Sequence, residues 1–178
     1  WAVSQILTIS YVSTIRTGHG SNWFTYYDIS LRHAFGNYRD ILREVSFNPM
    51  MGEFLSSRAS KSYAFQNTFP DENYARETMQ LFTTGPHKLD LHDSKILDKQ
   101  TNQPVDTYDN DDVTTFAKVW TGLDRQPGRG NTEKQIFGNY ENMVDPMLIK
   151  PDWHDPSPKA ALDNGYLGDQ YPLCHDLP

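Results

Sequence analysis

The stretch DENYARETMQLFTTG, residues 71–85, constrains the fold of this chain more than any other part of the sequence. It carries signals for both ends of one helix, because Asp71 can cap the N-terminus and Gly85, followed by Pro86, can end it. Four positions recur at the spacing of one helical face: Tyr74, Thr78, Leu81 and Phe82. The segment therefore predicts an amphipathic helix that needs a helical body to pack against.

A second face of the same helix is polar and comprises Asn73, Arg76, Glu77 and Gln80. Arginine donates through several N–H groups and a carboxylate can accept two of them, so Arg76 and Glu77 could form a buried polar lock. The stripe could also be a solvated face, which is the ordinary place for charged residues. A third interpretation makes Glu77 a catalytic carboxylate. We expect the structural lock first and keep the other two as alternatives.

The rest of the N-terminal half also predicts helices. Residues 1–13 are apolar on most sides, which favours a buried helix. A second helix is expected over 21–36 and a third over 38–45, and Asn48 can cap a fourth with Pro49 at its first position. The inward face of the second helix is expected to comprise Phe24, Tyr27, Leu31 and Phe35.

The C-terminal half changes character. Residues 88–108 alternate apolar and polar side chains, which predicts a β-hairpin, whereas 109–123 predicts a helix and 124–178 an irregular tail rich in Pro and Gly. The expected fold is mainly α: an irregular multi-helix domain with a small β-hairpin and a long loop-rich C-terminal segment. Because the uncapped apolar opening needs neighbours on several sides, we expect residues 1–178 to be the central part of one larger helical domain, with 1–87 as its helical core.

Composition excludes several classes of protein. A net charge of −7 and a pI near 5.2 argue against a nucleic-acid-binding surface and against an anionic membrane surface. No run approaches the roughly 20 apolar residues of a membrane span. Aromatic residues make up 13% of the chain, which favours a packed core over disorder. The single cysteine allows no internal disulfide.

Metal and catalytic signals are sparse. Asp109 and Asp111 could contribute to a calcium site, but the spacing of the acidic run does not match an EF-hand loop, and helix capping explains Asp111 or Asp112 equally well. No histidine pair has the spacing of zinc ligands, so we expect no transition metal and no cofactor. His154 and Asp155 could form a base oriented by a carboxylate. His33 is expected to be a satisfied core histidine. Nucleophile and phosphate-loop signatures are missing.

Two segments carry a resemblance to a known family. An Asn-x-x-Ala-Arg-Glu helix ends in a Phe-Thr-x-Gly turn, here Asn73, Ala75, Arg76, Glu77, Phe82, Thr83 and Gly85. A Tyr-x-x-x-Asp-Val segment and an Ala-x-x-x-Thr-Gly helix end follow, here Tyr108, Asp112, Val113, Ala117, Thr121 and Gly122. These motifs resemble the large, mostly bacterial family catalogued as domain of unknown function 1800.

Further stretches in the same order extend this resemblance over nearly the whole chain: WAVSQILTIS, LRHAFGNYRDILREVSFNPMMGEFLS and WHDPSPKAALDNGYLG. The hairpin at 88–108 is longer than in most bacterial members, an insertion covers 163–165, and the C-terminal end looks closer to eukaryotic, algal-type members. The resemblance implies an exported protein, since bacterial members are commonly exported and their genes often neighbour those of a sulfatase-like family. It carries over no catalytic residues.

Two functional hypotheses remain. The first is an exported, non-enzymatic surface or matrix protein whose partner is the rest of its own longer chain, another protein or a polysaccharide. The second is an exported hydrolase-like enzyme that uses a carboxylate, with Glu77 or the His154–Asp155 pair. Whether Glu77 and His154 share one open pocket distinguishes the two.

Overall fold

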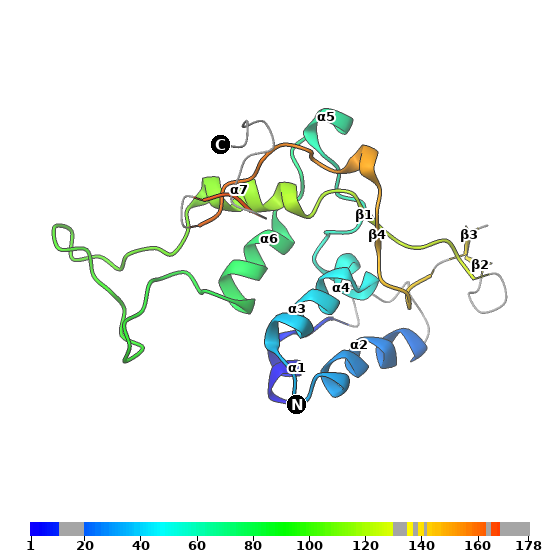
Figure 1. Cartoon of the computed structure of the whole chain (residues 1–178), viewed down its shortest axis with the longest axis horizontal. Helices are drawn as coiled ribbons and strands as arrows, with labels where there is room; N and C mark the ends of the chain where they lie inside the picture. Colours follow the sequence, from blue (N-terminus) through cyan, green and yellow to red (C-terminus); the bar gives the residue numbers. More distant parts are fainter. Residues whose placement is uncertain (11–19, 130–134, 137–138, 141, 163–164, 168–178) are drawn as a thin grey trace, which may run out of the picture.

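The structure is a computed structural model, and it describes residues 1–10, 20–129, 135–136, 139–140, 142–162 and 165–167. The protein is mainly helical (Figure 1). Its helical elements in chain order are α1 Ala2–Ile6, α2 Gly20–Arg32, α3 Tyr38–Phe47, α4 Pro49–Phe54, α5 Tyr63–Gln66, α6 Asn73–Glu77, a π-helix Thr78–Phe82, α7 Asn110–Val119 and a 3₁₀ turn Pro151–Trp153. In the described part of the chain, every helix is too short or too polar to cross a membrane.

Two small antiparallel strand pairs accompany the helices. Strand β1 (Leu123–Asp124) pairs with β4 (Leu148–Ile149), and β2 (Gln135–Ile136) pairs with β3 (Asn139–Tyr140). The β1–β4 pair lies on the helical body, whereas β2 and β3 lie at one end of the molecule (Figure 1).

Tyr74 lies at the centre of the helical core and is only 1% exposed. Its hydroxyl donates to Ser46 Oγ at 2.7 Å, which joins α6 to α3. Its ring packs edge-on against Trp120 at the end of α7, with centroids 4.9 Å apart. Burial raises the pKa of Tyr74 to about 12. The tyrosine therefore stays a neutral hydrogen-bond donor and connects three helices.

The first helix is shorter than the sequence predicts. The expected helix over 1–13 ends at Ile6, and residues 8–10 are not helical, while 11–13 fall outside the described residues. Two β-branched residues, Thr8 and Ile9, follow at this point and disfavour continuation. Leu7 and Ile9 nevertheless pack into the core. The segment is buried on one side only, because Trp1 and Ile6 are exposed.

The inward face predicted for the second helix is wrong. In α2 the buried residues are Asn22, Tyr26 and Ile29. The expected stripe lies outside: Phe24 is 73% and Leu31 71% exposed, and Tyr27 and Phe35 are exposed as well. The helix has two apolar faces, so periodicity alone could not select the buried one.

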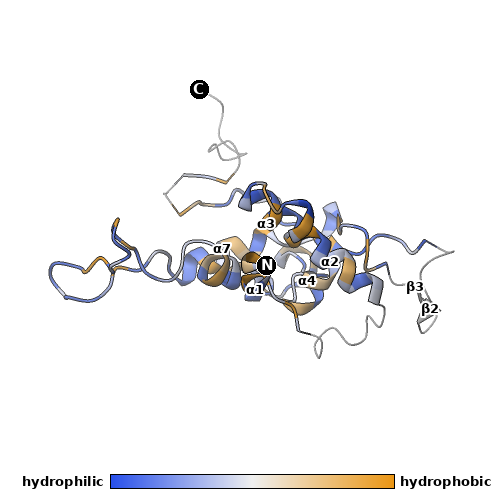
Figure 2. Ribbon diagram, turned by 90° about the horizontal axis from the view of Figure 1, so that it is seen from below, coloured by the Kyte–Doolittle hydropathy of each residue, from blue (hydrophilic) through white to orange (hydrophobic). Residues whose placement is uncertain are grey.

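Residues 86–107 form a projection at one end of the molecule instead of a regular hairpin (Figures 1 and 2). Three isolated bridges replace a continuous ladder: His87 with Asp106, Leu89 with Lys95, and Leu97 with Pro104. The backbone closes a ring in which Lys88 N–H donates to Val105, Val105 N–H to Ile96, and Ile96 N–H back to Lys88, each at 2.9 Å. Each segment thus uses its hydrogen bonds on two different neighbours, so no long strand pair forms.

Gly122 joins the helical body to the tail. Its N–H donates to Ser60 O at 2.9 Å, and its own carbonyl accepts from Lys150 N–H at 2.8 Å. The residue has φ of +87°, and a Cβ here would lie 3.0 Å from Lys150 O. Only glycine fits this crossing of three segments, which explains the Thr-Gly end of α7.

Candidate functional site

The polar stripe around Arg76 does not form the expected lock. Asn73 and Gln80 are exposed, and Arg76 pairs with Glu72 at 2.9 Å instead of with Glu77. Successive helical residues do not face each other, whereas Glu72 lies one turn before Arg76. Glu72 also accepts from Thr114 Oγ1 at 3.3 Å, so this residue, which the sequence did not single out, links α6 to α7.

Glu77 is half-buried, and its Oε2 atom is buried without a hydrogen-bond partner among the described residues. It lines a small hollow between α1, α4 and the π-helix. None of the residues lining that hollow belongs to the 150–159 segment that carries His154. The two groups therefore do not share this pocket.

The predicted His154–Asp155 pair is not formed. The Nδ1 atom of His154 lies 2.8 Å from the carbonyl of Thr121, so the ring is bound to the backbone. The buried carboxylate of Asp155 accepts from Ser157 N–H at 2.8 Å and lies 3.6 Å from the Lys159 ammonium. Burial raises the pKa of Asp155, but the hydrogen bonds from Ser157 and the charge of Lys159 outweigh it and hold the pKa below its usual range. These groups fasten the tail to α7.

The acidic run before α7 caps that helix. The side chain of Asp109 accepts from the N–H groups of Asp111 and Asp112, and Asp112 accepts from Asp109 N–H at 2.9 Å. The Oδ1 atom of Asp109 is thus engaged with two backbone N–H groups. In the described part of the chain no group of three or more His, Cys, Asp or Glu side chains could hold a metal.

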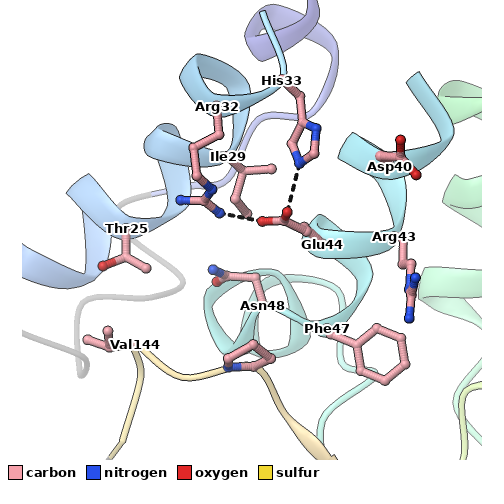
Figure 3. A pocket seen from close by; sticks show the side chains of 11 residues that line it. Thr25, Ile29, Arg32, His33, Asp40, Arg43, Glu44, Phe47, Asn48 and Val144 are labelled. Atoms are coloured by element: carbon pink, nitrogen blue, oxygen red, sulfur yellow. Dashed lines mark hydrogen bonds and ion pairs between the residues drawn. The ribbon is translucent and has the colours of Figure 1, made fainter. Parts of the chain in front are cut away.

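A larger cavity, of about 450 Å³, lies between α2, α3 and the segment before β4 (Figure 3). Apolar side chains form part of its lining: Ile29, Phe47, Val144 and Pro146. Polar and charged side chains form the rest: Thr25, Arg32, His33, Asp40, Arg43, Glu44 and Asn48. Ligand sites of proteins have this size and this mixture of apolar surface and a few convergent polar groups.

Glu44 interacts with two other polar residues that line the cavity. Its carboxylate forms an ion pair with Arg32 and lies 2.7 Å from Nε2 of His33, as Figure 3 shows. The hydrogen bond from His33, followed by the contribution of Arg32, holds the pKa of Glu44 below its usual range in spite of partial burial. The carboxylate therefore stays ionised and its charge is compensated within the chain.

The helix hairpin places these groups together. Arg32 and His33 lie at the end of α2, and a short turn follows in which the Asn37 side chain caps α3 by accepting from Arg39 N–H at 2.8 Å. The antiparallel return of α3 then brings Glu44 opposite the end of α2. The sequence analysis treated His33 as a core histidine and did not consider Glu44. Two amphipathic helices joined by a five-residue turn (33–37 between the elements) are the signal that could have indicated the pair.

Asn48 adds a donor at the floor of the cavity. Its side-chain oxygen accepts from Met50 N–H at 2.9 Å and caps α4, as the Asn48–Pro49 pair predicted. This leaves the NH₂ group of the amide as the part that can donate to a ligand. The cavity thus offers carboxylate acceptors and guanidinium, amide and hydroxyl donors from α2, α3 and the start of α4.

Comparison with known protein families gives a match over most of the chain. The family model described as Protein of unknown function (DUF1800) matches residues 4–172. No curated protein matches the chain, and no solved structure does.

Proposed function

The chain belongs to the DUF1800 family of proteins of unknown function, and from this premise we propose that it is an exported, non-enzymatic binding protein. Its ligand is a hydroxyl-rich, uncharged segment of a polysaccharide, and the binding site is the cavity between α2 and α3. The observation that carries this proposal is the charge-compensated wall of the cavity, in which Glu44 binds both Arg32 and His33.

The size of the cavity supports this ligand class. About 450 Å³ falls within the range of small-molecule sites, roughly 300–1,000 Å³. The volume suits a short saccharide segment better than a folded protein surface. Phe47 and Val144, which are half-buried, and Pro146, which is exposed, supply apolar area for the carbon faces of sugar rings.

The charge balance of the wall supports an uncharged ligand. Two arginines, Arg32 and Arg43, and two carboxylates, Asp40 and Glu44, line the same cavity, so neither sign of charge dominates. Planar side chains such as guanidinium, carboxylate and amide can donate or accept two hydrogen bonds side by side. Adjacent sugar hydroxyls, each a donor and an acceptor, match such pairs.

Calorimetric titration with neutral and acidic oligosaccharides tests the proposal. We expect neutral oligosaccharides to bind, and Glu44→Gln to weaken binding at least tenfold, because one acceptor and the arrangement of Arg32 are lost. Glu72→Gln is the matched control, since it removes another carboxylate paired with an arginine, far from the cavity lining. Absence of binding to any neutral oligosaccharide, or equal affinity of the Glu44 and Glu72 variants, would overturn the proposal.

A second function, a hydrolase, is favoured by one observation: the 2.7 Å contact between His33 Nε2 and Glu44. A carboxylate in this position could orient an imidazole as a general base. However, the other ring nitrogen of His33, Nδ1, lies close to the backbone of Gly36. A Cβ atom at position 36 would be only 3.3 Å from it. Hydrolysis of aryl glycosides or esters that is lost in His33→Gln, with oligosaccharide binding retained, would favour the enzyme over the binding protein.

A further inference from the structure

Glu77 stands at a break in helix geometry. Helix α6 ends at this residue, and Thr78–Phe82 continues as a π-helix. Single π-helical turns within α-helices are rare and frequently occur at functional sites. The change of period turns Met79 into the core and leaves Leu81 exposed, although the α-helical pattern placed Leu81 inside.

The carboxylate of Glu77 faces an apolar environment. The hollow that it lines has a volume of about 220 Å³. The other lining residues are Ile6, Thr8, Phe54, Leu55, Leu81 and Phe82, and threonine is the only polar side chain among them. The hollow is smaller than the roughly 300 Å³ at which sites for whole ligands begin, so one side chain is a better fit.

This carboxylate has no compensating charge among the described residues. The nearest cation in sequence, Arg76, pairs with Glu72. The Oε2 atom is buried and lacks a donor in the part of the chain that the structure describes. A buried polar atom without a partner is costly, and an ionised oxygen is more so, which calls for a donor from outside. Rotation about the last side-chain torsion of glutamate is soft, so the carboxylate can turn an oxygen toward the hollow.

We infer that the Glu77 hollow binds an alkylguanidinium or alkylammonium group, namely the end of an arginine or lysine side chain of a partner. The aliphatic stem would lie against Ile6, Phe54 and Leu81, and the cationic head would donate to Glu77. Such side chains bury their stems and keep the charged head at a polar partner. This site is separate from the cavity between α2 and α3, so the inference does not rest on the proposed function.

Titration of the whole chain with n-butylguanidinium, followed by NMR of the methyl groups of Ile6 and Leu81, tests the inference. n-Butylammonium is the second probe and n-butanol the uncharged control. We expect both cations to shift these methyl signals with saturation, butanol to bind at least tenfold more weakly, and Glu77→Gln to lose at least tenfold in cation affinity. Equal binding of butanol and the cations, or unchanged cation binding in Glu77→Gln, would overturn the inference.

A second variant provides a check that does not depend on the folding of Glu77→Gln. Leu81→Trp keeps Glu77 and fills the hollow from an exposed position, so the fold should tolerate it. We expect it to block the cations while Glu72→Gln, the control on the neighbouring ion pair, binds them as the unaltered chain does. Cation binding that survives Leu81→Trp would show that the probes bind elsewhere and would contradict the site.

Discussion

Two glutamates in this protein occupy opposite electrostatic situations. Glu44, on α3, interacts with Arg32 and His33. Glu77, at the start of the π-helix, has a buried oxygen without a partner among the described residues. The negative charge of Glu44 is balanced by side chains of its own chain, so its cavity is nearly neutral and suits an uncharged ligand. The negative charge of Glu77 is not balanced by any described residue, so its hollow favours a cationic ligand. Compensation of charge, more than residue type, decides what each site can bind.

Tyr74 packs against Phe82, which lines the Glu77 hollow, and donates to Ser46 on α3. Removing Tyr74 should therefore have the largest effect on both regions. Tyr74→Ala deletes a ring that packs against Trp120 and the hydrogen bond to Ser46, so we expect a loss of about 3–5 kcal/mol in the free energy of unfolding. Tyr74→Phe keeps the ring and should cost about 1 kcal/mol. Chemical denaturation measures both. Similar losses for the two variants would show that the hydroxyl, and not the packing, holds the regions together.

Replacing each glutamate by glutamine should distinguish the two regions directly. Glu44→Gln weakens an ion pair that is partly exposed, so we expect a loss of up to about 1 kcal/mol. Glu77→Gln removes a charge that has no partner among the described residues, so the chain should lose no stability and should gain some. Denaturant unfolding at neutral pH checks the sign of each change. A larger loss for Glu77→Gln than for Glu44→Gln would reverse the comparison.

The stability of the α2–α3 region should depend on acid pH through Glu44. Its pKa in the folded protein lies below the ordinary value of about 4.5, so its contribution is present above that value and is lost as pH falls through the folded pKa. The unaltered chain should therefore lose more stability between about pH 5 and pH 2 than Glu44→Gln does. Thermal unfolding across this range measures the difference. Parallel pH profiles would show that His33 and Arg32 do not stabilise the carboxylate.

The smallest effect is expected on the outer face of α2. Leu31→Ser should change the free energy of unfolding by less than about 0.5 kcal/mol, because Leu31 is mostly exposed. Ile29→Ser, two positions earlier on the buried face, should cost several times more and serves as the matched control. A large loss in the free energy of unfolding for Leu31→Ser would show that Leu31 is buried, as the sequence predicted.

Local signals in the sequence predicted much of the helical architecture. The Asn48–Pro49 start of α4 is confirmed, because a cap and a proline depend only on neighbouring residues. The acidic run before α7 does cap a helix, although the cap is Asp109 and not a later aspartate. Such features are fixed within one turn of chain and need no knowledge of the tertiary structure.

The site could not be predicted in the same way. Glu44 meets Arg32 and His33 only after α3 folds back on α2, and spacing along one helix does not report that contact. The expected Arg76–Glu77 lock is not formed, because Glu72 lies one turn before Arg76 and pairs with it, whereas successive helical residues do not face each other. The π-helix then changed the period after Glu77, which no α-helical wheel anticipates.

Thermal unfolding of the two glutamine variants with and without n-butylguanidinium tests the central claim most directly. A ligand that binds only the folded chain raises its melting temperature. Glu44→Gln should melt below the unaltered chain and still be stabilised by the cation. Glu77→Gln should melt no lower than the unaltered chain and should not respond to the cation. If both variants respond equally, Glu77 has no special need for an external cation, and the contrast between the two carboxylates is contradicted.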